Sequence, residues 1–242
     1  MALDPSLAET NFSQAVYLFF FERTWPDCEK FLRRAISINP RMVDAPAYLG
    51  MTLACRGRVD EALEEARLVL DIDPLSPFSH FLAAAVFCLI ERFDLMEEAA
   101  RRVLDLQSDA MSGLWTLVVA LCSLDRAAEA VPFAERAVLL SRAPFYLGQL
   151  GLVYARIGRH GDARRLVDEL EDRASRGEYI SPIAPLSINV GLGDEAGIRT
   201  ALAACVADSV PFPSIGLACG GLLNAYRNTD PEISRLYEAL KP

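Results

Sequence analysis

The amino-acid sequence predicts an all-α fold, a right-handed superhelical solenoid of about six helix-turn-helix repeats closed by a C-terminal helical cap. Two observations predict it: the chain matches itself at a step of 34 residues, and no segment shows the period-2 alternation of strands. The composition agrees, because 52% hydrophobic and 24% charged residues with a mean hydropathy of +0.20 describe a folded, strongly apolar chain.

The internal repeat is clearest in the middle of the chain. A shift of 34 residues superposes Arg58-Val59-Asp60 on Arg92-Phe93-Asp94, and a second shift brings Arg126 under Arg58. A shift backwards places Ile38-Asn39-Pro40 over Ile72-Asp73-Pro74. Each repeat is long enough for two helices and a turn, so stacked helical hairpins are expected.

We expect a single solenoid domain over 1–242, and turn-forming residues divide it into repeats. Gly57, Gly158 and Gly193 fall between the two helices of a repeat, and Pro40 and Pro74 stop second helices. We place the repeats over 9–42, 43–76, 77–110, 111–143, 144–178 and 179–208, and the cap over 209–242.

The two ends of the chain depart from the repeat. The cap is predicted to contain an apolar helix around Ile215 to Tyr226 and a last helix opened by Asp230-Pro231. At the start, Leu3-Asp4-Pro5 has two interpretations: the end of a preceding repeat, or the start of the first helix.

Several segments resemble the tetratricopeptide repeat, whose pattern pairs Leu-Gly with a later Tyr and Ala. The best copy is Leu150-Gly151 followed by Tyr154-Ala155. Asp71 to Pro77, Tyr179 to Pro182 and the Asp230-Pro231 helix look more narrowly like the repeat region of bacterial class III adenylate cyclases and of ToxR-type winged-helix activators. The resemblance implies a regulatory or sensory module, since the chain contains neither a cyclase domain nor a winged helix.

Charge and hydropathy exclude several functions. A formal net charge of -9 and a pI near 4.8 disfavour nucleic-acid binding, because that affinity comes from basic side chains. The most apolar run, Phe81 to Ile90, is too short to cross a membrane. Six scattered cysteines and no secretory pattern at the start lead us to expect unbridged thiols and a cytoplasmic protein.

Chemistry-bearing residues are sparse, so we expect no enzyme activity, no cofactor and no metal. The only histidines are His80 and His160, and they lack the i, i+4 spacing of a helical zinc site. A solvated turn explains His160, and a structural or capping role is favoured for His80. The alternative is an enzyme with its site near His80.

The first helices of stacked repeats line a groove, which is predicted to bind a partner protein or peptide. Counting from the Leu-Gly step selects an apolar and aromatic set with Arg156 as its one basic member: Tyr17, Phe20, Phe21, Met51, Cys55, Phe78, Phe81, Cys88, Trp115, Val119, Cys122 and Arg156. Such a surface suits a helical or extended apolar segment. Two alternatives stay open: a homodimer formed through the groove, and a groove filled by the chain's own C-terminal tail. Any of these aromatic residues, Trp115 included, could instead belong to the core.

Overall fold

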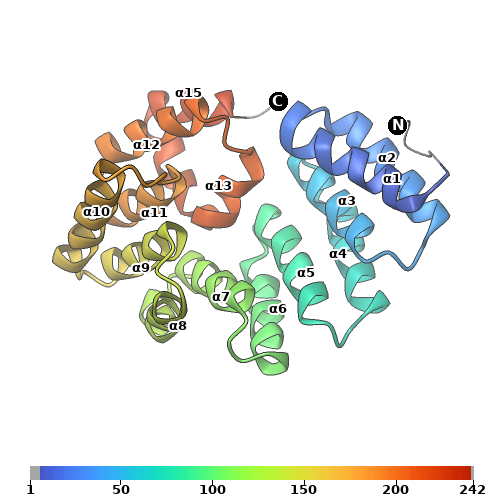
Figure 1. The fold of residues 1–242 in the computed structure, drawn as a ribbon, viewed down its shortest axis with the longest axis horizontal. Coiled ribbons are helices and arrows are strands. Elements are labelled where there is room, and N and C mark those ends of the chain that lie inside the picture. The colour runs from blue at the N-terminus through green and yellow to red at the C-terminus, as the bar shows by residue number, and fades with distance from the viewer. Residues whose placement is uncertain (1–5, 241–242) are drawn as a thin grey trace. The chain divides into compact units, whose positions relative to one another are not determined.

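The computed structural model describes residues 6–240, and the regular elements in that part of the chain are all helices (Figure 1). The predicted all-α class is therefore confirmed. Leu3-Asp4-Pro5 lies outside the described residues. The chain forms two compact units, which meet in sequence between Ala110 and Met111. This division coincides with the predicted boundary between the third and fourth repeats.

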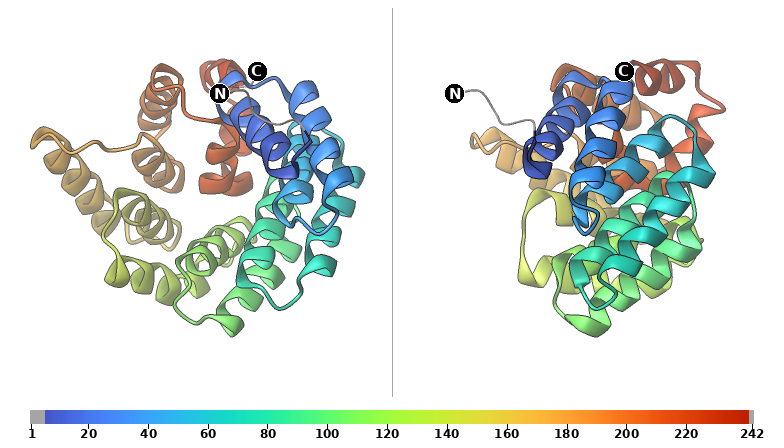
Figure 2. Two further views of the ribbon diagram at one scale, coloured as in Figure 1. Left: turned by 45° about the vertical axis from the view of Figure 1, so that its right-hand side comes forward. Right: turned by 90° about the vertical axis from the view of Figure 1, so that its right-hand side faces the viewer.

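Unit 1 contains three helical hairpins, one in each of the first three predicted repeats. Figure 2 shows their helices side by side, in blue to green. The helices are α1 (Ala8–Tyr17), continued by a π-helical turn (Leu18–Glu22), α2 (Trp25–Ile38), α3 (Asp44–Cys55), α4 (Val59–Ile72), α5 (Pro77–Leu89) and α6 (Phe93–Leu106). The first helices of the hairpins are therefore α1, α3 and α5.

Unit 2 contains three further hairpins followed by a C-terminal segment. The hairpins are α7 (Met111–Ser123) with α8 (Ala127–Leu140), α9 (Pro144–Arg156) with α10 (His160–Ser175), and α11 (Ile183–Leu192) with α12 (Glu195–Ala207). The C-terminal segment holds α13 (Phe212–Cys219), a 3-10 turn (Gly220–Leu222), α14 (Leu223–Arg227) and α15 (Pro231–Ala239).

The 34-residue match has a structural cause at the turn inside each hairpin. In all six described hairpins the turn before the second helix contains a residue with positive φ: Arg23 (55°), Gly57 (73°), Glu91 (59°), Asp125 (60°), Gly158 (81°) and Gly193 (70°). In four of them an arginine follows and pairs with an acid in the first turn of the next helix. These pairs are Arg58 with Glu61 (2.6 Å), Arg92 with Asp94 (2.7 Å), Arg126 with Glu129 (2.7 Å) and Arg159 with Asp162 (2.7 Å). The repeated arginines thus mark the start of second helices.

An ion cluster joins the first two hairpins of unit 1. Glu29 of α2 accepts hydrogen bonds from Arg33 of its own helix (3.0 Å) and from Arg58 at the start of α4 (2.9 Å), and it pairs with Arg56. Burial of Glu29 opposes ionisation, but the hydrogen bonds from Arg33 and Arg58 outweigh it and lower the pKa of this carboxyl. The charged form is therefore favoured in the folded state.

In unit 2, α11 approaches α9 closely because glycines remove side chains from the contact. A Cβ at Gly148 would lie 2.8 Å from the backbone of Ala184, and one at Gly151 would lie 2.6 Å from Ile188 Cγ1. On α11, a Cβ at Gly191 would lie 2.9 Å from the carbonyl oxygen of Leu152. Glycine is needed here for space, since each of these distances is shorter than real Cβ contacts.

For the C-terminal cap, the predicted last helix is confirmed, but the predicted first helix is wrong. Asp230 caps α15 by accepting from the backbone N–H of Glu232 (2.8 Å) and Ile233 (3.0 Å). The expected continuous helix over Ile215 to Tyr226 is instead broken at Gly220, which adopts φ 54° and ψ -142°. That conformation is open to glycine and interrupts the helical ladder between α13 and α14.

Gly148→Ala should destabilise the protein by about 1 to 3 kcal/mol, because the added methyl group meets the backbone of Ala184 and forces two helices apart. The matched control is Gly161→Ala in α10, where a Cβ has nothing within 4 Å. That change should leave stability equal or slightly raised, because alanine favours helix. Thermal unfolding measures both, and an equal effect would disprove the close contact between α9 and α11.

Glu29→Gln should lower stability near neutral pH by about 1 kcal/mol, since it removes the shared partner of three arginines. The pKa of Glu29 is lowered by folding, so its contribution is present above the ordinary glutamate pKa and is lost as pH falls through the folded value. The difference between wild type and variant in urea unfolding should therefore shrink below about pH 4. A constant difference down to about pH 2 would rule out this linkage.

Candidate protein-binding surface

The first-helix face of unit 1, meaning the surface formed by α1, α3 and α5, begins with an aromatic cluster around Tyr48. The ring of Tyr48 meets Phe12, Phe19 and Phe20 edge to face, with centroids 5.3, 5.7 and 6.1 Å apart. Phe19 is fully buried and Phe20 is half-buried. Phe20, expected in the groove, therefore serves partly to hold α1 against α3.

Two aromatic rings stand outside that cluster. Tyr17 is 46% exposed and Phe21 is 74% exposed, and their rings stack with centroids 5.6 Å apart. The Tyr17 hydroxyl donates to Glu22 Oε1 (2.7 Å), and this hydrogen bond to a carboxylate raises the pKa of Tyr17. The π-helical turn over 18–22 ends at Arg23, whose φ is 55°. The two stacked rings together form an exposed apolar pair on the first-helix face.

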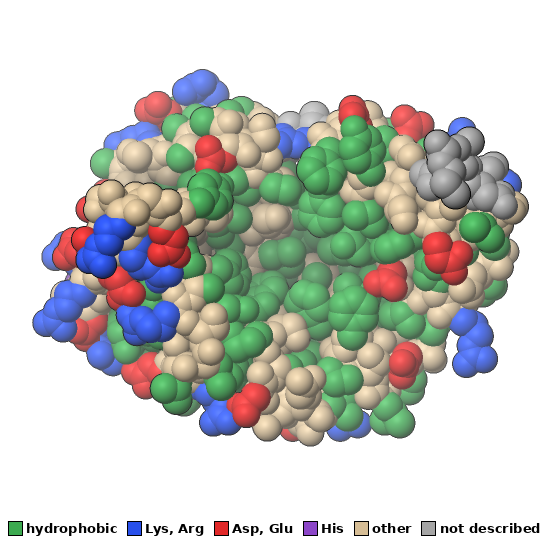
Figure 3. Space-filling view, viewed as in Figure 1, with side chains coloured by type: hydrophobic (Ala, Val, Ile, Leu, Met, Phe, Trp, Pro, Cys, Tyr) green, Lys and Arg blue, Asp and Glu red, His purple; other side chains and the backbone are tan. Residues whose placement is uncertain are grey.

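The next first helices add a third exposed ring and buried neighbours. Phe78 of α5 is 51% exposed, and its ring centroid lies 6.4 Å from that of half-buried Phe81. Figure 3 shows apolar side chains gathered over this part of unit 1. Cys55 is half-buried, and burial raises the pKa of its thiol to about 12. The expectation that Met51 faces a partner is wrong for this structure, because it is only 6% exposed and packs in the core, as does Cys88.

In unit 2 the first-helix face is covered by the chain's own C-terminal segment. The α13 helix packs on α7 and α11, and the 3-10 turn after it also packs on α7, which Figure 1 shows in orange-red beside α7 and α11. Buried Gln149 of α9 donates from Nε2 to the carbonyl oxygen of Ala218 in α13 (3.0 Å). Ser187 of α11 contacts Cys219 (Oγ to Sγ, 3.9 Å).

Two further residues that the sequence placed in the groove are buried in unit 2. Val119 and Cys122 of α7 are buried, Val119 to 1%, so neither is available to a partner. Burial also raises the pKa of the Cys122 thiol to about 12. The helical period does not show which faces of α7 are covered, and α8, α9 and α13 all pack on this helix.

Trp115 and Arg156 both keep accessible surface. Trp115 is half-buried and meets Phe145 of α9 edge to face at 5.5 Å, whereas its neighbour Leu114 is 1% exposed in the core. Arg156 pairs with Asp125, with Nη2 2.6 Å from Oδ1. That pairing occupies the one basic side chain that was expected in the groove.

Two residues that the sequence did not single out hold these faces in place, Tyr48 in unit 1 and Gln149 in unit 2. Each stands immediately before a Leu-Gly step, in Tyr48-Leu49-Gly50 and in Gln149-Leu150-Gly151. The glycines turn toward the first helix of the next repeat, since a Cβ at Gly50 would lie 3.0 Å from Val86 Cγ2 on α5. The residue immediately before a Leu-Gly step could therefore have been predicted from the sequence to lie on the first-helix face.

The residues around His80 form a pocket of about 510 Å³ between α4, α5 and α6, with Arg67, Glu98 and Arg101 in its lining. The ring Nε2 of His80 lies 2.9 Å from the carbonyl oxygen of Pro74 and hydrogen-bonds to it, which anchors the start of α5. His160 is exposed at the first position of α10.

Three further expectations concern metals, membranes and cysteines. Within residues 6–240, no group of three or more His, Cys, Asp or Glu side chains is placed to hold a metal ion. No helix of the described chain combines the length and apolar character needed to cross a bilayer. All six cysteines are free thiols, as expected, five of them buried and Cys55 half-buried.

Comparison with known proteins places the fold. No protein-family model matches the chain, and no curated protein sequence matches it. Among solved structures, the tetratricopeptide protein TTC0263 from Thermus thermophilus is 14% identical, with a TM-score of 0.58 over 82% of this chain and 99% of that one. PilF from Pseudomonas aeruginosa is 15% identical, with a TM-score of 0.57 over 83% and 90%.

A third likeness is to the TPR-like repeats of a kinesin light chain protein from Podospora anserina, in a variant form, which are 15% identical, with a TM-score of 0.60 over 73% of this chain and 99% of that one. These likenesses show the fold alone. The narrower resemblance to the repeats of adenylate cyclases and ToxR-type activators stays a prediction. The chain thus has the tetratricopeptide-type fold of stacked helical hairpins.

Proposed function

We propose that this chain is a protein-binding module without enzymatic activity, which acts as a regulatory or sensory scaffold. The first-helix face of unit 1 binds a helical or extended apolar segment of a partner protein through Tyr17, Phe21, Phe78 and Phe81. Repeat folds of this kind present such faces to partners, and apolar faces of helices accept amphipathic helices.

The strongest support for this proposal is that a segment of the chain itself covers the equivalent face of unit 2. The segment from Phe212 to Leu222 lies there, and it contains no charged residue. This segment makes apolar contacts, and the backbone carbonyl oxygen of Ala218 accepts one hydrogen bond from the Gln149 side chain. The first-helix face of this fold therefore suits a short, uncharged, apolar helix.

The exposed rings of unit 1 supply the contact area for a similar segment. Phe21 and Phe78 keep more than half of their surface exposed, and aromatic side chains dominate the energetics of interfaces. Arginine side chains line the pocket at His80 instead, so the two surfaces of unit 1 differ in chemistry. The aromatic face is the better candidate for an apolar partner.

Phe21→Ser should weaken partner binding by roughly thirtyfold, because loss of an aromatic anchor costs about 2 kcal/mol. Phe78→Ser should have a similar effect, and neither change should alter thermal unfolding much, since both rings are exposed. The matched control is Leu139→Ser on the second helix α8, where the side chain is 84% exposed.

The measurement has two steps. A partner captured from native extract by wild type but not by Phe21→Ser is identified and purified, and its dissociation constant is then measured by calorimetry for all three variants. Equal affinity for wild type, Phe21→Ser and Phe78→Ser would contradict the proposal. Light scattering tests the alternative of self-association, since a dimer that dissociates in Phe21→Ser would make a second copy the occupant.

Gln149→Leu should loosen the C-terminal segment, because it leaves the buried carbonyl oxygen of Ala218 without its donor at a similar side-chain volume. The expected cost is about 1 to 3 kcal/mol. Hydrogen exchange followed by mass spectrometry should show that exchange in α13 is faster in the variant than in wild type, while exchange in α10 changes less. Uniform acceleration across unit 2, or no change in α13, would argue against Gln149 as the anchor.

A further inference from the structure

A second pocket lies in unit 2 on the side of the second helices, away from the first-helix face. It has a volume of about 430 Å³ and is bounded by α10, α11 and α12. It exists because the glycine contacts bring α11 close to α9, while the loop over 176–182 lets α10 stand away from α11. A pocket of this size is at the lower end of those that bind small groups.

The walls of this pocket are mainly apolar. Val167 and Leu170 line it from α10, Pro182 and Pro185 from the start of α11, and Ala201 from α12. The prolines and alanine present short, rigid surfaces that leave the space between the helices unfilled. An elongated apolar body fits between such walls.

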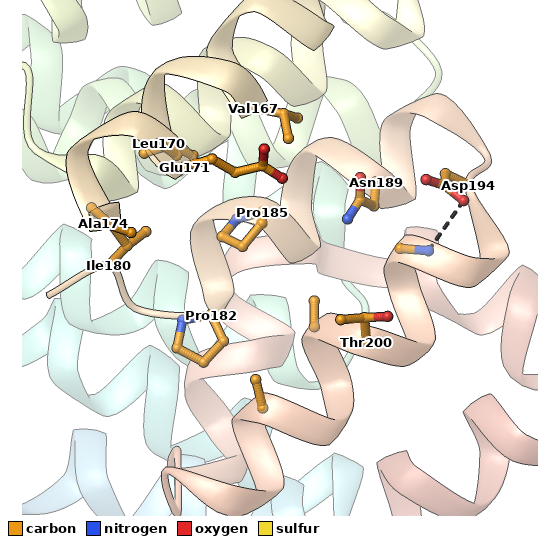
Figure 4. A pocket seen from close by; sticks show the side chains of 13 residues that line it. Val167, Leu170, Glu171, Ala174, Ile180, Pro182, Pro185, Asn189, Asp194 and Thr200 are labelled. Carbon is orange, nitrogen blue, oxygen red and sulfur yellow. Dashed lines mark hydrogen bonds between the residues drawn. The ribbon is translucent and has the colours of Figure 1, made fainter. Parts of the chain in front are cut away.

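Two polar side chains point into the pocket from opposite walls, the carboxylate of Glu171 and the amide of Asn189 (Figure 4). Within residues 6–240, neither side chain makes a hydrogen bond or an ion pair. The remaining carboxylate, Asp194, accepts from the backbone N–H of Gly197 (3.1 Å) as the cap of α12. Within the described chain, no arginine or lysine is part of the lining.

We propose that this pocket binds one arginine side chain from a segment of a partner protein. The guanidinium donates to the Glu171 carboxylate, where two parallel hydrogen bonds are possible, and to the amide oxygen of Asn189. The methylene stem packs on Val167, Leu170 and Pro185. The charge is complementary, because the lining is acidic and the chain carries a net charge of -9.

This site is independent of the proposed function, since it uses neither the aromatic rings nor the first helices of unit 1. It also differs from the pocket around His80, whose lining holds three arginines, Arg67, Arg101 and Arg102, beside Glu98 and Asp105.

The test is a nuclear magnetic resonance titration of the full chain with the peptide acetyl-Ala-Leu-Arg-Leu-Ala-amide. The expected result is chemical-shift changes confined to α10, α11 and α12. A peptide with citrulline in place of arginine keeps the shape but loses the charge, and it should bind at least about tenfold more weakly. Phe21→Ser should leave binding of the arginine peptide unchanged.

Glu171→Gln should lower affinity for the arginine peptide to that of the citrulline peptide. The matched control is Asp168→Asn on the same helix, which removes the same charge outside the pocket lining and should change affinity less than about twofold. Ala174→Leu narrows the pocket from an exposed position and should abolish binding of both peptides.

Any of four results would overturn the proposal: no shifts at α10 to α12, equal binding of the arginine and citrulline peptides, equal losses in Glu171→Gln and Asp168→Asn, or unchanged binding in Ala174→Leu. A fifth concerns the source of the cation. If N-acetylarginine methylamide binds as tightly as the peptide, the pocket takes a free small cation and the assignment to a partner segment is wrong.

Discussion

Close packing of helices at small side chains is the constraint on which the rest of this structure depends. Each hairpin must bury its apolar face against its neighbours, and the helices can approach only where side chains are short. Alanine fills these contacts on second helices, at Ala62, Ala66, Ala100 and Ala130, all fully buried. Glycine takes over where first helices meet, at Gly50 and Gly151.

The same constraint shapes the surfaces as well as the core. In unit 2 the glycines bring α11 close to α9. As a result, α11 packs less closely against α10. The pocket at Glu171 follows from this difference in spacing. One set of contacts between first helices thus determines the space available between second helices on the opposite side.

The two units treat their first-helix faces differently. Unit 2 covers its own face with the segment around α13, held by Gln149. Unit 1 leaves the rings of Phe21 and Phe78 exposed. A chain that fills one such face with its own uncharged helix indicates what kind of segment the other face suits, which is the physical basis for the proposed function.

The sequence by itself determined the helical class, the 34-residue hairpin and the positions of the turns. These features are local: positive φ at Gly57 and Gly158, an arginine that pairs forward, and small residues at a fixed period. Tertiary structure alone decided which apolar residues of the first helices are accessible. Met51 and Val119 were selected from the same helical period as Phe21 and Phe78, yet in the folded protein the first two are buried and the last two are exposed. The pocket at Glu171 was likewise invisible in the sequence, because it depends on the spacing of three helices and not on any motif within one of them.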